Sequence, residues 1–257
     1  MIFDSHAHYD DSRFDEDRHD LLTSLHENGV GKIVNIGASL RSCEEMIDFI
    51  EKYDFMYGTV GVHPEDLAAM SDAFLEKMKV WAQHEKIVAI GEIGLDYYYD
   101  DVAPNLQKEW FIKQANLARE LSLPIVVHSR DAAKDTVDML RDMHAEEIGG
   151  VIHCYSYTKE TARDFLNMDF YFGVGGVLTF KNGKKLREAV EYIPIDKIVV
   201  ETDCPYLAPE PFRGKRNHSG YIAYVLDKLA EIKGISREEA ERITYENACR
   251  LYRLPNE

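Results

Sequence analysis

The sequence lacks three features that mark common classes of protein. No apolar run approaches the roughly 18 residues that a membrane-spanning helix requires, so we expect no membrane span. Only 4 cysteines occur in 257 residues, without a C-x-x-C pair, which gives no zinc-finger spacing and suits free, mostly buried thiols. Basic residues number 30 against 46 acidic residues, and a formal charge of −16 disfavours general coating of nucleic acid.

Targeting and nucleotide-binding signatures are also missing. The N-terminus has no basic segment followed by an apolar stretch, so we expect no signal peptide and a cytoplasmic location. The first strand-like run is not followed by G-x-G-x-x-G, and no Walker A sequence occurs. Both absences count against an open, doubly wound nucleotide-binding sheet.

What the chain does contain is a series of eight short apolar runs. They cover residues 1–6, 32–37, 56–63, 87–94, 124–129, 150–156, 170–176 and 197–203. The runs are almost continuously apolar rather than alternating, which is typical of parallel strands covered on both faces.

The intervals between these runs carry helical patterns. Leu21, Leu22 and Leu25 have helical spacing before Gly29, and Pro104 begins another helical segment. A third helix follows Ser129 or Asp131, either of which could be its N-cap. Eight strands alternating with helices in about 250 residues predict a (β/α)8 TIM barrel, an α/β fold, as a single domain over residues 1–257.

Ionisable residues gather at the ends of the predicted strands, where barrels of this kind place their catalytic groups. Five of the 10 histidines and two carboxylates stand there: His6, His8, His63, Glu92, His128, His153 and Asp203. A single histidine is usually a packed or surface residue, but convergence at one barrel mouth predicts a metal site. So many ligands favour two divalent ions.

The spacing suggests how the ligands divide between two ions. His6 and His8 point to the same side of their strand, and Asp203 lies on the strand that adjoins it in a closed barrel. Those three residues can bind one ion. The second ion would lie among residues from three consecutive strands, with a carboxylate able to bridge both ions: Glu92, His128 and His153.

These motifs resemble those of TatD-type metal-dependent deoxyribonucleases, within the amidohydrolase superfamily. The matching segments, in order between residues 3 and 217, are FDSHAH, GVHP, GEIGLDYY, PIVVHSRDA, GVIHCYS and ETDCPYLAP…RGKRN. The resemblance implies the same six ligands, two divalent ions (Mg, Mn or Zn), and hydrolysis of phosphodiester bonds in DNA, often from a 3′ end.

Three positions depart from the family pattern. Tyr157 stands where the family often has glycine, and His218 and Ser219 replace the acid and the proline of a common RNEP motif. None is a proposed ligand. We expect the departures to lie near substrate.

Several roles stay open at this point. We hypothesise that a metal-activated water attacks phosphorus and that Asp203 receives its proton, with a purely ligating Asp203 as the alternative. His63 could contact a substrate phosphate, orient a ligand or belong to a turn. Asp4 and Glu201 could support ligands or form structural ion pairs.

Basic residues concentrate after the last two strands, the usual phosphate-binding corner of this fold. The candidate substrate-binding residues in the final loop are Arg213, Lys215, Arg216 and Asn217. Aromatic residues near strand exits could stack on bases or pack under loops: Tyr97, Tyr98, Tyr99 and Phe212.

The leading interpretation is therefore a two-metal DNA exonuclease or phosphodiesterase acting on DNA 3′ ends or another phosphodiester, without a membrane or an obligate protein partner. An amidohydrolase-type enzyme that cuts a C–N or ester bond in a small molecule would use the same ligands. A non-catalytic metal-binding protein is a third possibility, and a carboxylate able to act as a base argues against it.

Overall fold

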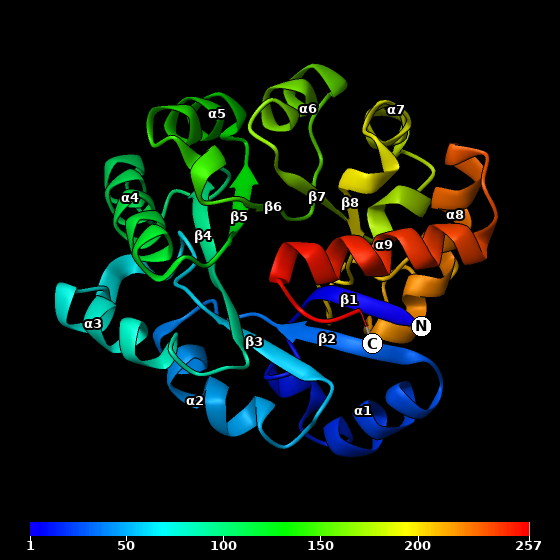
Figure 1. The fold of residues 1–257 in the computed structure, drawn as a ribbon, viewed down its shortest axis with the longest axis horizontal. Coiled ribbons are helices and arrows are strands. Elements are labelled where there is room, and N and C mark those ends of the chain that lie inside the picture. Colours follow the sequence, from blue (N-terminus) through cyan, green and yellow to red (C-terminus); the bar gives the residue numbers. More distant parts are fainter. Residues whose placement is uncertain (257) are drawn as a thin grey trace. The chain divides into compact units, whose positions relative to one another are not determined.

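The computed structural model describes residues 1–256, in which strands and helices alternate along the chain (Figure 1). The strands are β1 (Ile2–Ala7), β2 (Val30–Asn35), β3 (Met56–Val60), β4 (Ile87–Asp96), β5 (Ile125–Arg130), β6 (Gly150–Ile152), β7 (Tyr171–Val174) and β8 (Ile198–Val200). Each of the eight overlaps one of the predicted apolar runs.

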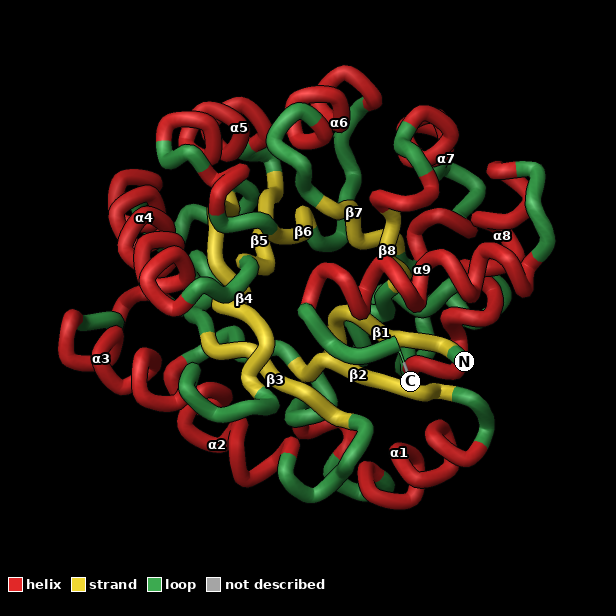
Figure 2. The backbone as a smooth tube through the Cα atoms, viewed as in Figure 1, coloured by secondary structure: helices red, strands yellow, loops and turns green. Residues whose placement is uncertain are grey.

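Helices follow the strands in turn (Figure 2). They are α1 (Arg18–Glu27), α2 (Leu40–Ile50), α3 (Asp72–Trp81), α4 (Pro104–Leu121), α5 (Ala133–Asp142), α6 (Lys159–Leu166), α7 (Lys184–Tyr192), α8 (Ile222–Lys233) and α9 (Arg237–Tyr252). Within residues 1–256, none of these helices combines the length and apolar character needed to cross a bilayer.

The strands form one eight-stranded sheet whose order follows the chain from β1 to β8. The strand pairs whose registers are resolved are parallel. A parallel bridge between Ala7 and Cys204 brings the end of β1 beside the segment that follows β8. This arrangement confirms the predicted (β/α)8 barrel.

The chain divides into two compact units. The first unit comprises Met1–Asn35, Cys154–Arg163 and the chain from Tyr171 onward, and it contains β1, β2, β7 and β8. Within this unit α9 lies beside β1 (Figure 1). The hydroxyl of Tyr252 donates to the carbonyl of Ser5 at 2.8 Å, which fixes the last helix to the first strand.

The second unit comprises Ile36–His153 and Asp164–Phe170 and contains β3 to β6. All ten residues of β4 are buried, as expected for a strand covered on both faces. From α4, Gln114 exchanges two hydrogen bonds with the backbone of Val62, at 2.8 and 3.2 Å, and so fixes the segment after β3.

The boundaries of some elements differ from the predicted ones. β4 runs to Asp96 rather than residue 94, because Gly94 lets it continue pairing with β5. A Cβ at Gly94 would lie 2.0 Å from the carbonyl oxygen of His128, and its φ of +142° also favours glycine. The N-cap prediction for α5 was wrong: Ala132 holds that position and makes no side-chain cap.

Candidate metal centre

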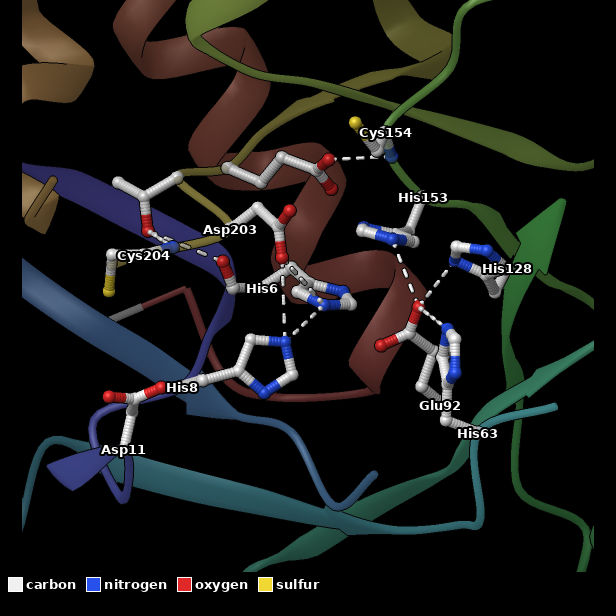
Figure 3. A network of polar contacts seen from close by, with 12 residues as sticks. His6, His8, Asp11, His63, Glu92, His128, His153, Cys154, Asp203 and Cys204 are labelled. Atoms are coloured by element: carbon white, nitrogen blue, oxygen red, sulfur yellow. Dashed lines mark hydrogen bonds and ion pairs between the residues drawn. The ribbon is translucent and has the colours of Figure 1, made fainter. Parts of the chain in front are cut away.

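The first donor group consists of His6, His8 and Asp203 and lies within the first unit (Figure 3). The Nε2 atoms of the two histidines are 3.1 Å apart. Oδ1 of Asp203 lies 3.7 Å from Nε2 of His6 and 3.4 Å from Nε2 of His8. The predicted convergence of these three side chains is therefore observed.

Backbone pairing beyond the strand ends positions this group. The amide of Asp203 donates to the carbonyl of His6, and the amide of His8 donates to the carbonyl of Cys204, both at 2.9 Å. These bonds continue the β1–β8 contact past the formal strands. They place a carboxylate beside two imidazoles that leave β1 on the same side.

Asp4 holds the residues of the first donor group in place through hydrogen bonds. It is fully buried, and its carboxylate accepts hydrogen bonds from Thr202, Ser219 and the amide of His6. Burial raises the pKa of Asp4 to about 7, even though these hydrogen bonds favour its charged form. Asp4 thus ties together the backbone segments that carry His6 and Asp203 and forms no ion pair within residues 1–256.

Ser219 belongs to this buried network rather than to an open surface. Its hydroxyl donates to Asp4 at 2.7 Å and lies 2.8 Å from the hydroxyl of Tyr9, and its amide donates to the same Tyr9 hydroxyl at 2.9 Å. A proline could not donate that amide hydrogen bond. Ser219 is 0% exposed and therefore offers no surface to a substrate, and its expected position near substrate stays a prediction.

The second donor group surrounds the carboxylate of Glu92 within the second unit (Figure 3). Oε1 of Glu92 lies 2.9 Å from Nδ1 of His128, 3.1 Å from Nε2 of His153 and 3.7 Å from Nε2 of His63. Burial by itself would raise the pKa of Glu92, but His153, His63 and the hydrogen bonds hold it well below its usual value. Glu92 is therefore an anionic centre among three imidazoles.

The strand register brings the members of this group together. His128 pairs with Gly94 of β4, and His153 follows β6 with its amide donating to Val127 of β5 at 3.0 Å. Glu92 lies inside β4, not at its end as predicted, and a register irregularity between Ile90 and Ile93 accompanies it. The extra length of β4 accounts for this difference.

The ring of His63 can donate a hydrogen bond from Nε2. Its Nδ1 accepts the amide of Glu65 at 3.3 Å, so the ring proton belongs on Nε2, which faces Glu92. Burial and the neighbouring His128 lower the pKa of His63 to about 3, which keeps the ring neutral. The residue also takes part in a turn, since its carbonyl accepts the amide of Asp66 at 2.9 Å.

Asp96 is a site residue that the sequence analysis missed. Its Oδ2 lies 2.9 Å from Nε2 of His128, on the opposite side of that ring from Glu92, and the residue is 1% exposed. Glu92 and Asp96 are four residues apart on one strand, so alternation places both on the same side. The segment GEIGLD contains both acidic residues at this spacing, but the predicted strand ended at residue 94, before Asp96.

Both donor groups have the chemistry of a metal site. Ligand atoms about 2.0–2.1 Å from one ion, at tetrahedral or octahedral angles, are separated by about 2.9–3.4 Å. The measured separations of 2.9–3.7 Å fall in or near that range. The residues therefore fit a divalent ion, with imidazole nitrogens and carboxylate oxygens as ligands.

The predicted substrate-binding residues after β8 have mostly structural contacts. Arg216 forms a bidentate ion pair with Asp17, at 2.8 and 2.6 Å. Asn217 is buried, and its side-chain amide donates to the carbonyl of Thr202 at 2.8 Å. Arg213 is exposed above the ring of Phe180, and Lys215 is exposed. Their role in binding substrate stays a prediction.

Comparisons with known proteins place the whole chain in one family. Residues 3–253 match the family model described as TatD related DNase. The chain is 44% identical to the uncharacterized metal-dependent hydrolase YabD of Bacillus subtilis, covering 99% of this chain and 100% of that protein. It is 32% identical to the 3′-5′ ssDNA/RNA exonuclease TatD of Cronobacter sakazakii, covering 98% and 97% of the two chains.

The fold agrees with this placement. The crystal structure of YJJV, a TatD homologue from Escherichia coli K12, superposes with a TM-score of 0.92 at 28% identity and covers 99% of this chain and 98% of that one. With the family match, the strand order and the two donor groups, the chain belongs to the TatD-related DNase family and is a metal-dependent hydrolase.

Proposed function

We propose that this protein is a two-metal phosphodiesterase that removes nucleotides from the 3′ end of DNA. The observation that carries the proposal is the pair of donor groups, each of which brings histidines together with a carboxylate. His6, His8 and Asp203 would hold one ion. The other ion would lie among Glu92, His128 and His153, and the bridging role of Glu92 stays a prediction.

The bound ions would supply Lewis acidity to a phosphoryl oxygen and to water. Asp203 is the more exposed carboxylate, at 20% against 5% for Glu92, and it can accept a proton from water that enters the site. His63, with its proton on Nε2, can donate a hydrogen bond to a phosphoryl oxygen. Asp203 as a ligand alone is the alternative role.

The choice of DNA rests on the family and on one named relative. The Cronobacter sakazakii protein carries the name of a 3′-5′ exonuclease for single-stranded DNA and RNA. The exposed cations of Arg213 and Lys215 supply local positive charge on a chain of net charge −16. Mg²⁺, Mn²⁺ and Zn²⁺ are the candidate ions.

The test compares single-stranded DNA labelled at the 3′ or the 5′ end. Protein stripped of metal and reloaded with Mg²⁺, Mn²⁺ or Zn²⁺ should release the 3′ label first as a mononucleotide. Glu92→Gln should slow release by about 10²–10³-fold. Glu188 is an exposed carboxylate on α7, and Glu188→Gln should not change the rate. Activity on an amide or lactone panel without phosphodiester cleavage would instead establish the amidohydrolase alternative.

A further inference from the structure

Two tyrosines and an arginine form an exposed cluster near the ends of β4 and β5. Tyr98 is 56% exposed and Tyr99 is 43% exposed, with ring centroids 4.8 Å apart at 86°. The guanidinium carbon of Arg130 lies 3.8 Å from the centre of the Tyr98 ring and 5.2 Å from that of Tyr99. We call Tyr98, Tyr99 and Arg130 the Tyr-Arg platform.

The strand register fixes the platform beside the second donor group. Asp96 of β4 pairs with Arg130 of β5, and the amide of Tyr97 donates to the carbonyl of Arg130 at 2.9 Å. On β5, His128 and Arg130 are two residues apart and therefore leave the strand on the same side. Arg130 is thus the last residue of β5, and Tyr98 and Tyr99 lie at the start of the segment that joins β4 to α4.

One carboxylate holds both the platform and a proposed ligand. Oδ1 of Asp96 accepts the amide of Tyr98 at 2.9 Å, and Oδ2 lies 2.9 Å from Nε2 of His128. Gln107 of α4 fixes the backbone of Asp96 with two hydrogen bonds of 2.8 Å. Asp96 therefore fixes the place of the tyrosines relative to the second donor group.

Arg130 is exposed, and its charge acts on the carboxyl group of Glu65 without a direct ion pair between them. Arg130 forms no ion pair within residues 1–256, in contrast to Arg216, whose guanidinium is neutralised by Asp17. Exposed acids follow directly at Asp100 and Asp101. Their negative charge disfavours a run of phosphates over the platform, while the exposed tyrosine rings offer aromatic faces to a neutral base.

We propose that the Tyr-Arg platform stacks an unpaired base of a single-stranded nucleic acid, with Arg130 contacting one adjacent phosphate. The inference rests on the proposed function, since the strand would lead to the second donor group. Stacking on an aromatic ring tolerates any base, so the platform selects for single strands rather than for sequence. Bases paired within a duplex are already stacked and cannot use it.

The experiment measures binding of the full chain to fluorescein-labelled oligothymidylate, about a dozen nucleotides long, by anisotropy in EDTA so that no strand is cleaved. Tyr98→Ala should raise Kd about tenfold, and Tyr98→Trp should retain binding. Arg130→Gln should also weaken binding and should lower the slope of log K against log salt by about 0.7. Tyr192→Ala, an exposed tyrosine on α7, is the matched control.

The outcomes distinguish a failure of the base-stacking proposal from a failure of the proposed function. An unchanged Kd for Tyr98→Ala, or equal weakening with a blunt duplex, overturns the platform even if the wild type cleaves DNA. Weakening by Tyr98→Ala with the predicted salt behaviour supports it. If such binding occurs in a wild type that cleaves no phosphodiester with any metal, the proposed function fails and the platform stands.

Discussion

The two donor groups are built on different plans. In the first, two imidazole nitrogens face each other at 3.1 Å and the carboxylate stands farther off, at 3.4 and 3.7 Å. In the second, one carboxylate oxygen lies at the centre, and two imidazoles approach it at 2.9 and 3.1 Å. The second group thus places imidazoles around one carboxylate, whereas the first places two imidazole nitrogens next to each other.

The acidic residues that hold the two donor groups in place also differ. Asp4 holds the first group through the backbone and hydroxyls around the ligands, so it acts on the chain and not on a ring. Asp96 contacts the imidazole of His128 directly. A carboxylate that accepts the far N–H of a ligating histidine fixes the tautomer and orients the ring. The comparison predicts different costs for equivalent substitutions.

We expect the largest difference in turnover between substitutions of the two carboxylates that we propose as ligands, Glu92 and Asp203. Glu92→Gln should lower turnover of single-stranded DNA by about 10²–10³-fold, the loss typical of one group that stabilises transition-state charge. It also removes the anion that three imidazoles surround. Asp203→Asn should cost less if Asp203 is only a ligand, and as much if it also accepts the proton. Steady-state kinetics of both variants decides, and equal full activity would contradict both roles.

We expect each donor group to contribute its own increment to the stabilisation of the protein by metal. At a free ion concentration about 100 times Kd, each occupied site adds about 2.7 kcal/mol to the free energy of unfolding. His8→Ala and His128→Ala should each lose about one such increment, measured by denaturant unfolding with and without Mn²⁺. His19→Ala, an exposed histidine on α1, should lose none. Loss of both increments in one variant would show that the groups do not bind independently.

We expect the contact between Asp96 and His128 to strengthen metal binding. Asp96→Asn keeps the size of the side chain but removes its charge, and we expect Mn²⁺ affinity to fall about 10–100-fold. Isothermal titration calorimetry measures the change, with the exposed Asp138→Asn as control. Unchanged affinity would reduce Asp96 to a structural residue.

We expect the hydrogen bonds around Asp4 to contribute to the stability of the protein and not to metal affinity. Ser219→Ala removes a buried hydroxyl bonded to Asp4 and Tyr9, and we expect a loss of about 1–3 kcal/mol in the free energy of unfolding. Mn²⁺ affinity should change little, since no ligand ring is touched. Urea unfolding of the metal-free protein provides the value, and an effect on affinity alone would refute the distinction.

Much of the fold and of both groups could be predicted from the sequence. Nearly continuous apolar runs identified all eight strands, and the two-residue alternation in HAH gave the shared direction of His6 and His8. The chain order of a closed barrel brought Asp203 to them. These are short-range patterns and topological rules, which a single sequence contains.

The remaining features depend on contacts between distant residues. The sequence does not reveal that Arg216 is neutralised by Asp17, 199 positions away, or that Ser219 is buried against Asp4. Asp96 was missed because the apolar run ends before it, while pairing with β5 prolongs the strand. Burial and ion pairing therefore corrected composition-based expectations most at the loop after β8.

The most direct test of the central claim is the number of ions that one chain binds. Calorimetric titration of metal-free wild-type protein with Mn²⁺ should show two equivalents per chain, and Glu92→Gln should retain the equivalent held by the first donor group. A single equivalent in the wild type, or none, would contradict a two-metal centre.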